Sequence, residues 1–240
     1  MIRIVPETGS TNSDLAAAIR GGEVLAEGDW LLADRQTAGR GRQGRHWFDG
    51  RGNFMGSSPV RLQERDPAPA SLSLVAGVAL YEAVLPFLAT PRDLTLKWPN
   101  DLMLGGAKLA GILLEREGDM IIVGIGVNLV AAPELPDRLT VALSDLGPAP
   151  DRDTFAQGLA SSFARELDRW RTFGLDPLIR RWESIAHRPG TTLKVHPPGE
   201  EPIMGTFAGL TKDGALRLCL VGGEERVIHA GDVMLGQEEG

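Results

Sequence analysis

The amino-acid sequence predicts an α+β protein that ends in a small all-β unit. Three observations support this class. Short apolar runs, typical of buried strands, are interspersed with helix-forming stretches as far as about residue 188. From Thr191 on, strand-like segments separated by turn pairs replace the helices, and Pro189-Gly190 breaks the chain between the two regions. We therefore expect a larger domain over residues 1–188 and, over 189–240, a unit the size of an SH3-like barrel.

The first half of the chain begins with a predicted helix. Ser10-Thr11-Asn12 precedes an Ala-rich stretch, which predicts a helix start, and Gly21-Gly22 predicts its end. Residues 30–33 and 54–62 predict two strands on either side of a Gly- and Arg-rich loop. Residues 71–88 predict an amphipathic helix, because apolar side chains recur there at near-helical spacing.

The second half predicts more strands and then two helices. Residues 94–98 alternate like a strand, and residues 103–127 predict strands around glycine turns, with 121–127 as a central strand. Residues 133–153 are rich in Pro and Asp and predict a loop. Apolar spacing between residues 155 and 185 predicts two helices.

Charge and cysteine content exclude several classes of protein. With 25 Lys and Arg against 32 Asp and Glu, the net charge is -7, so the chain lacks the basic footprint of a general nucleic-acid binder. The single cysteine, Cys219, excludes an internal disulfide framework and indicates a reducing compartment. We find no signal peptide and no stretch long and apolar enough to cross a membrane, so we expect a soluble, cytoplasmic protein.

The most informative stretch is the loop over residues 37–47, in which Arg40, Arg42 and Arg45 alternate with glycines. Its glycines fit the G-x-G-x-x-G spacing, but the residues that follow will not hold the helix that a dinucleotide-binding fold requires. Glycine lets backbone amides approach an anion, and arginine forks suit phosphate or carboxylate. The alternative is a solvated surface loop, and the aromatic pair Trp47-Phe48 favours a loop that closes over a ligand.

The segment Lys97-Trp98-Pro99-Asn100-Asp101 places three polar side chains at the end of a predicted strand, where ligands bind in α/β sheets. Asn100 can pair with the edge of adenine and Lys97 can bind a phosphate. Asp101 can hold Mg²⁺ that bridges to a nucleotide. A plain turn explains Pro-Asn-Asp equally well at this point.

Lys108 stands inside an otherwise apolar predicted strand. Because lysine is rarely buried unpaired, it either reaches solvent from a strand edge or faces a polar pocket that an anionic ligand occupies. Asn128, which follows the predicted central strand, likewise either reaches solvent or faces a polar pocket. The P-loop pattern G-x-x-x-x-G-K-[ST] does not occur in the sequence, so any ATP site is of another kind.

Together these motifs resemble the biotin–protein ligase family. Residues 36–47 match its Gly-Arg loop, residues 97–101 its second motif and residues 108–113 its third, with shorter matches at Ser10-Thr11-Asn12 and Gly126-Val127-Asn128. The motifs occur in the family's order and spacing, which is far more specific than any one of them. The resemblance implies a mixed sheet flanked by helices, the class II synthetase-like fold of biotin and lipoate ligases, followed by an SH3-like barrel.

The resemblance also implies a two-step reaction that uses biotin, ATP and Mg²⁺. The biotin carboxylate attacks the α-phosphate to give biotinyl-AMP and pyrophosphate, and a lysine of a biotin carboxyl carrier protein then attacks the mixed anhydride. Because the first nucleophile is already anionic, we expect catalysis by positioning and charge stabilisation. The candidate catalytic residues are Lys108, with Arg42 as helper, Lys97, and Asp101 as proton acceptor in the second step.

Carried over by position, the site residues form two groups. The biotin side comprises Ser10, Thr11, Asn12, Gln36, Gly39, Arg40, Met55, Lys108 and Gly111. The nucleotide side comprises Arg42, Arg45, Trp47, Lys97, Asn100 and Asn128, with Asp101 as the Mg²⁺ ligand. The family usually has Asn-Leu-Tyr after the loop, whereas this chain has Asn53-Phe54-Met55, so Met55 is expected to stand where an aromatic wall faces biotin.

The expected partner is the carrier domain of a biotin-dependent carboxylase. Because the first motif begins at Ser10, we expect no DNA-binding domain and no nucleic-acid partner. The sequence is compatible with a homodimer as well as with a monomer. The β unit is expected to assist without holding the biotin site. One alternative is a lipoate– or octanoate–protein ligase, against which the Gly-Arg loop and the 97–101 motif argue. The other is a non-catalytic biotin or nucleotide sensor, against which Lys97 and Lys108 argue.

Overall fold

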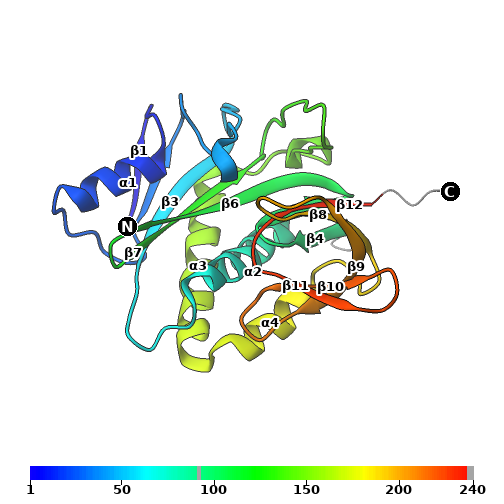
Figure 1. The fold of residues 1–240 in the computed structure, drawn as a ribbon. Coiled ribbons are helices and arrows are strands. Elements are labelled where there is room, and N and C mark those ends of the chain that lie inside the picture. Colours follow the sequence, from blue (N-terminus) through cyan, green and yellow to red (C-terminus); the bar gives the residue numbers. More distant parts are fainter. Residues whose placement is uncertain (91–92, 237–240) are drawn as a thin grey trace.

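A computed structural model, which describes residues 1–90 and 93–236, contains two sheets (Figure 1). The strands of the larger sheet are β1 (Ile2–Val5), β2 (Trp30–Ala33), β3 (Phe54–Arg61), β4 (Leu94–Lys97), β5 (Asp101–Leu104), β6 (Ala107–Glu117) and β7 (Met120–Val127). Their order is β1-β2-β3-β7-β6-β5-β4, so β7 is the middle strand, as predicted for residues 121–127. β1 and β2 are parallel and the other neighbours antiparallel, which confirms a mixed sheet.

The second sheet begins after the predicted break and is antiparallel throughout. Its order is β11-β10-β9-β8-β12, which brings the last strand next to the first one of the unit. This arrangement fits the expected small barrel. Its strands are β8 (Thr192–His196), β9 (Ile203–Leu210), β10 (Leu216–Leu220), β11 (Glu225–Ile228) and β12 (Asp232–Leu235).

The helices cover opposite faces of the larger sheet (Figure 1). They are α1 (Thr11–Arg20), α2 (Leu72–Val84), α3 (Arg152–Phe173) and α4 (Leu175–Ser184). Successive strand residues face opposite sides. Leu31 packs with Leu15 of α1, whereas the neighbouring Leu32 belongs to the main core with α2 and α3. The face that carries α1 is covered only in part, and the functional site lies on it.

The expectation of an amphipathic helix over residues 71–88 is wrong. Ten of the 13 residues of α2 are buried, because the helix lies between the sheet and the pair α3 and α4. Contrary to the expectation that no stretch could cross a membrane, residues 69–87, with a mean hydropathy of 1.6, also have the length and composition of a membrane span. A helix that is apolar on all sides suits a position inside a core equally well, and in this fold it is the central core helix.

The barrel packs tightly on the larger domain. Leu193, Val195 and Phe207 belong to the same continuous core as the first sheet, and the rings of Trp182 and Phe207 lie 6.4 Å apart. The indole N–H of Trp98 donates to the carbonyl of Gly214 at 3.1 Å. The barrel therefore lies against the ends of β4 and β5, next to the predicted site. The division at residues 188 and 189 stays a prediction.

Candidate active site

A cavity of about 1230 Å³ opens on the α1 face of the larger sheet. Its walls are the loop after β2, the turn between β4 and β5, strands β6 and β7, the 133–140 loop, and two barrel segments, 196–200 and 232–235. Pockets for one small ligand measure roughly 300–1,000 Å³. The cavity is therefore large enough for two ligands side by side.

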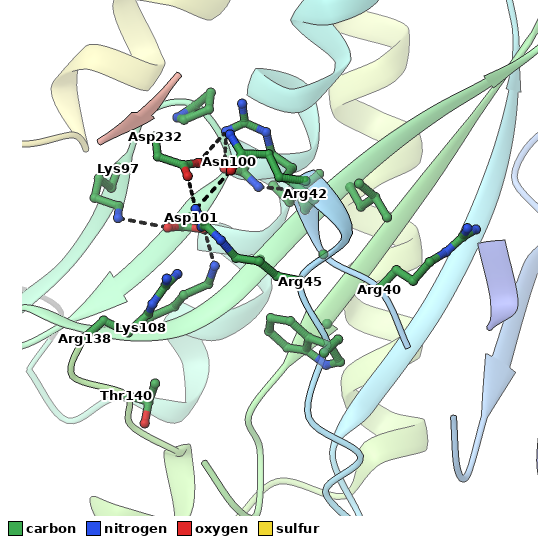
Figure 2. A pocket seen from close by; sticks show the side chains of 18 of the residues that line it. Arg40, Arg42, Arg45, Lys97, Asn100, Asp101, Lys108, Arg138, Thr140 and Asp232 are labelled. Carbon is green, nitrogen blue, oxygen red and sulfur yellow. Dashed lines mark hydrogen bonds and ion pairs between the residues drawn. The ribbon is translucent and has the colours of Figure 1, made fainter. Parts of the chain in front are cut away.

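The centre of the cavity holds a Lys–Asp–Lys cluster of Lys97, Asp101 and Lys108 (Figure 2). The hairpin of β4 and β5 pairs Lys97 directly with Asp101, so both side chains share one face. Asp101 is also paired with Gly111 on β6. Because glycine has no side chain, Lys108 can reach across this position: a Cβ on Gly111 would lie 3.2 Å from its Nζ. The ammonium groups lie 3.0 Å (Lys97) and 2.6 Å (Lys108) from the carboxylate.

The cluster fixes the ionisation of Asp101. Burial alone would raise the pKa of this carboxyl, but the charges and hydrogen bonds of Lys108 and Lys97 outweigh burial and lower the pKa from 3.8 to about 2. Such a weak base cannot accept a proton readily near neutral pH, which argues against Asp101 as the proton acceptor of the second step.

The same geometry argues against Asp101 as a Mg²⁺ ligand, because its two oxygens already face two ammonium groups. Within residues 1–90 and 93–236, no group of three or more His, Cys, Asp or Glu side chains is placed to hold a metal. Lys108 does not lie at an edge of the sheet, because β6 pairs with β5 on one side and β7 on the other. Its ammonium group is also not unpaired, because Asp101 is its counter-ion.

The arginine loop, residues 39–52, arches over one side of the cluster (Figure 2). Arg42 donates to Asn100 Oδ1 at 3.3 Å and to the carbonyl of Gly231 at 3.2 Å. Arg45 forms an ion pair with Asp232, and Arg42 lies 3.8 Å from the same carboxylate. A barrel residue thus holds two arginines of the loop where an anionic ligand would compete for them. These contacts of Asp232 are compatible with the expectation that the β unit assists without holding the biotin site.

The aromatic residue of the loop, Trp47, lies against a floor made by glycines of β6 and β7. A Cβ on Gly126 would collide with its ring, and one on Gly111 would lie 3.1 Å from it. The ammonium of Lys108 is 5.8 Å from the ring centroid. The two glycines therefore allow a flat, apolar surface next to the charged cluster, which suits a hydrocarbon chain or a ring.

A buried polar network forms the opposite end of the cavity, under α1. The N–H of Thr11 donates to Gln36 Oε1 at 2.8 Å, and the Thr11 hydroxyl, whose oxygen lies 3.1 Å from the same Oε1, donates to Ser57 Oγ at 2.6 Å. Ser57 donates to Asn12 Oδ1 at 2.5 Å, and the Asn12 amide donates to Glu115 at 2.7 Å. Glu115 also pairs with Arg40 at 3.2 Å. Because Gln36 is held through its oxygen and Asn12 through both ends of its amide, the orientations of both side chains are fixed before a ligand arrives.

Most of the predicted site residues meet in this one cavity. Its lining includes Ser10, Thr11, Asn12, Gln36, Arg40, Arg42, Arg45, Trp47, Lys97, Asn100, Asp101, Lys108, Gly111 and Asn128. The amides of Asn100 and Asn128 are already engaged: Asn100 donates to the carbonyl of Ile112 at 2.6 Å, and Asn128 donates to that of Val141 at 3.2 Å. The two asparagines therefore also hold the walls of the cavity together.

Gly39 and Met55 do not line the cavity. Gly39 accepts a hydrogen bond from the N–H of Trp47 at 2.9 Å, and its lack of a side chain lets Gln36 and Trp47 approach it. Met55 is opposite Gly126 in the sheet and is 1% exposed. Because paired residues share a face, Met55 lies on the side of the sheet that carries Trp47 and the cavity, and its role as a wall of the biotin site stays a prediction.

Sequence reasoning missed four side chains of the cavity and its supports: Ser57, Glu115, Arg138 and Asp232. A buried serine inside an apolar strand is a signal that could have found Ser57. The other three have no local signal, because their importance depends on partners that only the fold brings near.

Comparisons with known proteins agree with this geometry. Residues 17–128 match the profile of the Biotin/lipoate A/B protein ligase family. The chain is similar to the biotin–[acetyl-CoA-carboxylase] ligase of Mycobacterium tuberculosis, with 39% identity over 96% of this chain and 87% of that protein. It is 38% identical to the enzyme of the same name from Paracoccus denitrificans, over 94% and 98% of the two chains. A solved biotin protein ligase from Aquifex aeolicus, in complex with biotin and ATP, superposes with a TM-score of 0.84 at 27% identity, over 98% of this chain and 99% of that one.

Proposed function

The chain belongs to the biotin–[acetyl-CoA-carboxylase] ligase family, and from this premise we propose how its cavity joins biotin to a carrier protein. The protein is an ATP-dependent biotin–protein ligase. Biotin and ATP react to form biotinyl-AMP and pyrophosphate, and a carrier lysine then displaces AMP to form an amide. The observation that carries the proposal is a single cavity with a polar network of no net charge at one end and a cationic cluster at the other.

The polar network fits the head group of biotin. A ureido group carries two N–H donors and one carbonyl acceptor, and therefore needs both kinds of partner at fixed positions. Thr11 uses the carbonyl oxygen of Gln36, which leaves the Gln36 amide N–H groups to donate to a ligand. Such a matched set also argues against lipoate, whose dithiolane ring would leave these buried polar groups without partners.

The cationic end fits the reacting carboxylate and the phosphates of ATP. Lys108 stands at the junction between the glycine floor and the Lys–Asp–Lys cluster, where the biotin carboxylate would meet the α-phosphate. Lys97, Arg42 and Arg45 surround the same space. The developing charge on the phosphoryl oxygens would be stabilised by these positioned cations, without a general base.

The second step needs access for a macromolecule. We propose that the carrier is the biotin carboxyl carrier domain of a carboxylase and that it reaches the mixed anhydride through the open mouth of the cavity. Asp101 is not assigned as the base for the attacking amine, because its pKa of about 2 makes it a poor proton acceptor. We place the enzyme in the cytoplasm, where carrier domains and ATP occur together, and we propose neither a nucleic-acid partner nor a fixed oligomeric state.

Pyrophosphate exchange measured separately with biotin and with lipoate tests this proposal. Exchange of labelled pyrophosphate into ATP should depend on biotin and Mg²⁺. Exchange that depends on lipoate or octanoate instead would assign the chain to the other branch of the fold. Tight binding of biotin or nucleotide without exchange would make the protein a sensor.

A further inference from the structure

The 133–140 loop places the cationic side chain of Arg138 in the cavity, in addition to the lysines and arginines already described. Leu135 and Arg138 form an antiparallel bridge that closes a tight turn at Pro136 and Asp137. Just beyond it, Thr140 forms a parallel bridge with Lys108. The backbone N–H of Lys108 donates to Leu139 at 2.9 Å, and Val141 donates back to Lys108 at 3.1 Å. The loop is therefore fastened to the strand of the reacting lysine.

This pairing determines where the side chain of Arg138 points. Residues paired across two strands share a face, and so do residues two positions apart on one strand. Thr140 thus shares the face of Lys108, and Arg138 shares the face of Thr140. Figure 2 shows Arg138 beside Lys108, on the side of the cluster away from Arg42, and all three line the cavity.

The partner of Arg138 is one that a ligand can replace. Its guanidinium is bound to the adjacent Asp137, through Nε at 3.1 Å and through a second nitrogen. This hydrogen bond raises the pKa of Arg138, and the charges of Asp101 and Asp232 add to the effect. The Asp137 side chain is 53% exposed, and ion pairs of this kind contribute little to stability. A phosphate with two oxygens for the arginine fork would compete well.

The charge balance also calls for an anion at this end of the cavity. Five cationic side chains meet three carboxylates, and a fourth carboxylate of the lining, Glu200, is paired with Arg226. The excess is two positive charges. The cations are Arg42, Arg45, Lys97, Lys108 and Arg138, and the carboxylates are Asp101, Asp137 and Asp232.

We propose that Arg138 is a further substrate-binding residue, which exchanges Asp137 for the phosphate that becomes part of biotinyl-AMP. This rests on the proposed function. Because the 133–140 loop is fastened to the backbone of Lys108, Arg138 lies at the reacting phosphate rather than at the far end of the triphosphate. Arg138 then serves both steps: it binds ATP in the first, and it keeps the adenylate in the cavity until the carrier lysine arrives.

The test compares Arg138→Ala, Arg138→Lys and a matched control, Arg116→Ala, on the exposed outer part of β6. Loss of a charge-assisted fork should raise the KM for ATP in biotin-dependent exchange by ~10- to 100-fold and speed the release of biotinyl-AMP by a similar factor. Lysine should restore only part of the loss, because it binds phosphate as a point charge. The control should match the wild type, and the Kd for biotin alone should be unchanged in all three.

Asp137→Asn provides a readout in the opposite direction. Removing the competing carboxylate should lower the KM for ATP by a few fold, which a purely structural role for the turn would not do. The inference is overturned if Arg138→Ala keeps the wild-type KM for ATP and retains the adenylate, if its biotin affinity falls in parallel, or if Asp137→Asn raises the KM. Absence of biotin-dependent exchange in the wild type would instead reject the proposed function.

Discussion

Replacement of Asp101 by asparagine removes the one negative charge between two lysines while it preserves the shape of the side chain. The pKa of the carboxyl falls from 3.8 to about 2 in the folded protein, and 1.36 kcal/mol per unit gives a contribution of about 2 kcal/mol to the free energy of unfolding. A folded-state pKa below the unfolded value stabilises the protein above the unfolded pKa. This contribution should therefore be complete above about pH 5 and be lost as the pH falls towards about 2.

Urea unfolding of the wild type and of Asp101→Asn over this pH range measures the effect. The difference in unfolding free energy should be about 2 kcal/mol near neutral pH and shrink steadily below about pH 4. The variant should also slow adenylation and transfer together, by ~10-fold or more, because Lys97 and Lys108 lose the anchor that orients them. A stability difference independent of pH would refute the ionisation argument. Normal adenylation with a selective loss of transfer would show that Asp101 is the base after all.

Three further predictions test other parts of the cavity. Lys108→Ala should fold but lose ~10²-fold or more of adenylation, as expected for one preorganised charge, and near-normal pyrophosphate release would contradict its role. Trypsin should cut the ligand-free protein within residues 39–52, and biotin with Mg-ATP should protect this loop more than ATP alone; equal cleavage rates would mean that the loop is not a gate. Met55→Tyr should lower the unfolding free energy by ~1–3 kcal/mol, because the added volume has no space, and a variant of full stability with tighter biotin binding would place Met55 in the site.

Local sequence predicted most of the site because its parts lie on short hairpins. Three residues separate Lys97 from Asp101, so a strand followed by a turn was enough to bring them together. Likewise, Gly111 and Lys108 lie within one motif, and the strand that carries them was apparent from its apolar run. The resemblance of several motifs in order then supplied the chemistry that no single motif carried.

The parts that sequence reasoning missed depend on distant contacts. Asp232 reaches Arg45 from 187 positions away, across two sheets, and no local pattern predicts such a pair. The low pKa of Asp101, which argues against its predicted role as proton acceptor, has no local signal either, because it depends on two lysines that converge on one carboxylate. The 71–88 helix was read as amphipathic from one set of spaced residues, although Leu74, Val78 and Leu80 make its other faces apolar as well.

The barrel contributes residues to the site. Its strand β12 supplies Asp232, and the carbonyl of Val233 accepts a hydrogen bond from Lys97 at 2.9 Å. A chain that ends before the barrel would also expose the apolar core that the two units share. The barrel therefore cannot be treated as an independent appendage, although its contacts lie at the nucleotide end of the cavity and the polar network under α1 does not involve it.

Transfer of biotin to a carrier domain tests the central claim most directly. The purified protein is incubated with biotin, Mg-ATP and a biotin carboxyl carrier domain, and the carrier is examined by mass spectrometry together with a variant in which its acceptor lysine is arginine. We expect one biotin per carrier, on that lysine, with none on the arginine variant and none when lipoate replaces biotin. An unmodified carrier in the presence of both substrates, or modification by lipoate but not by biotin, would contradict the account.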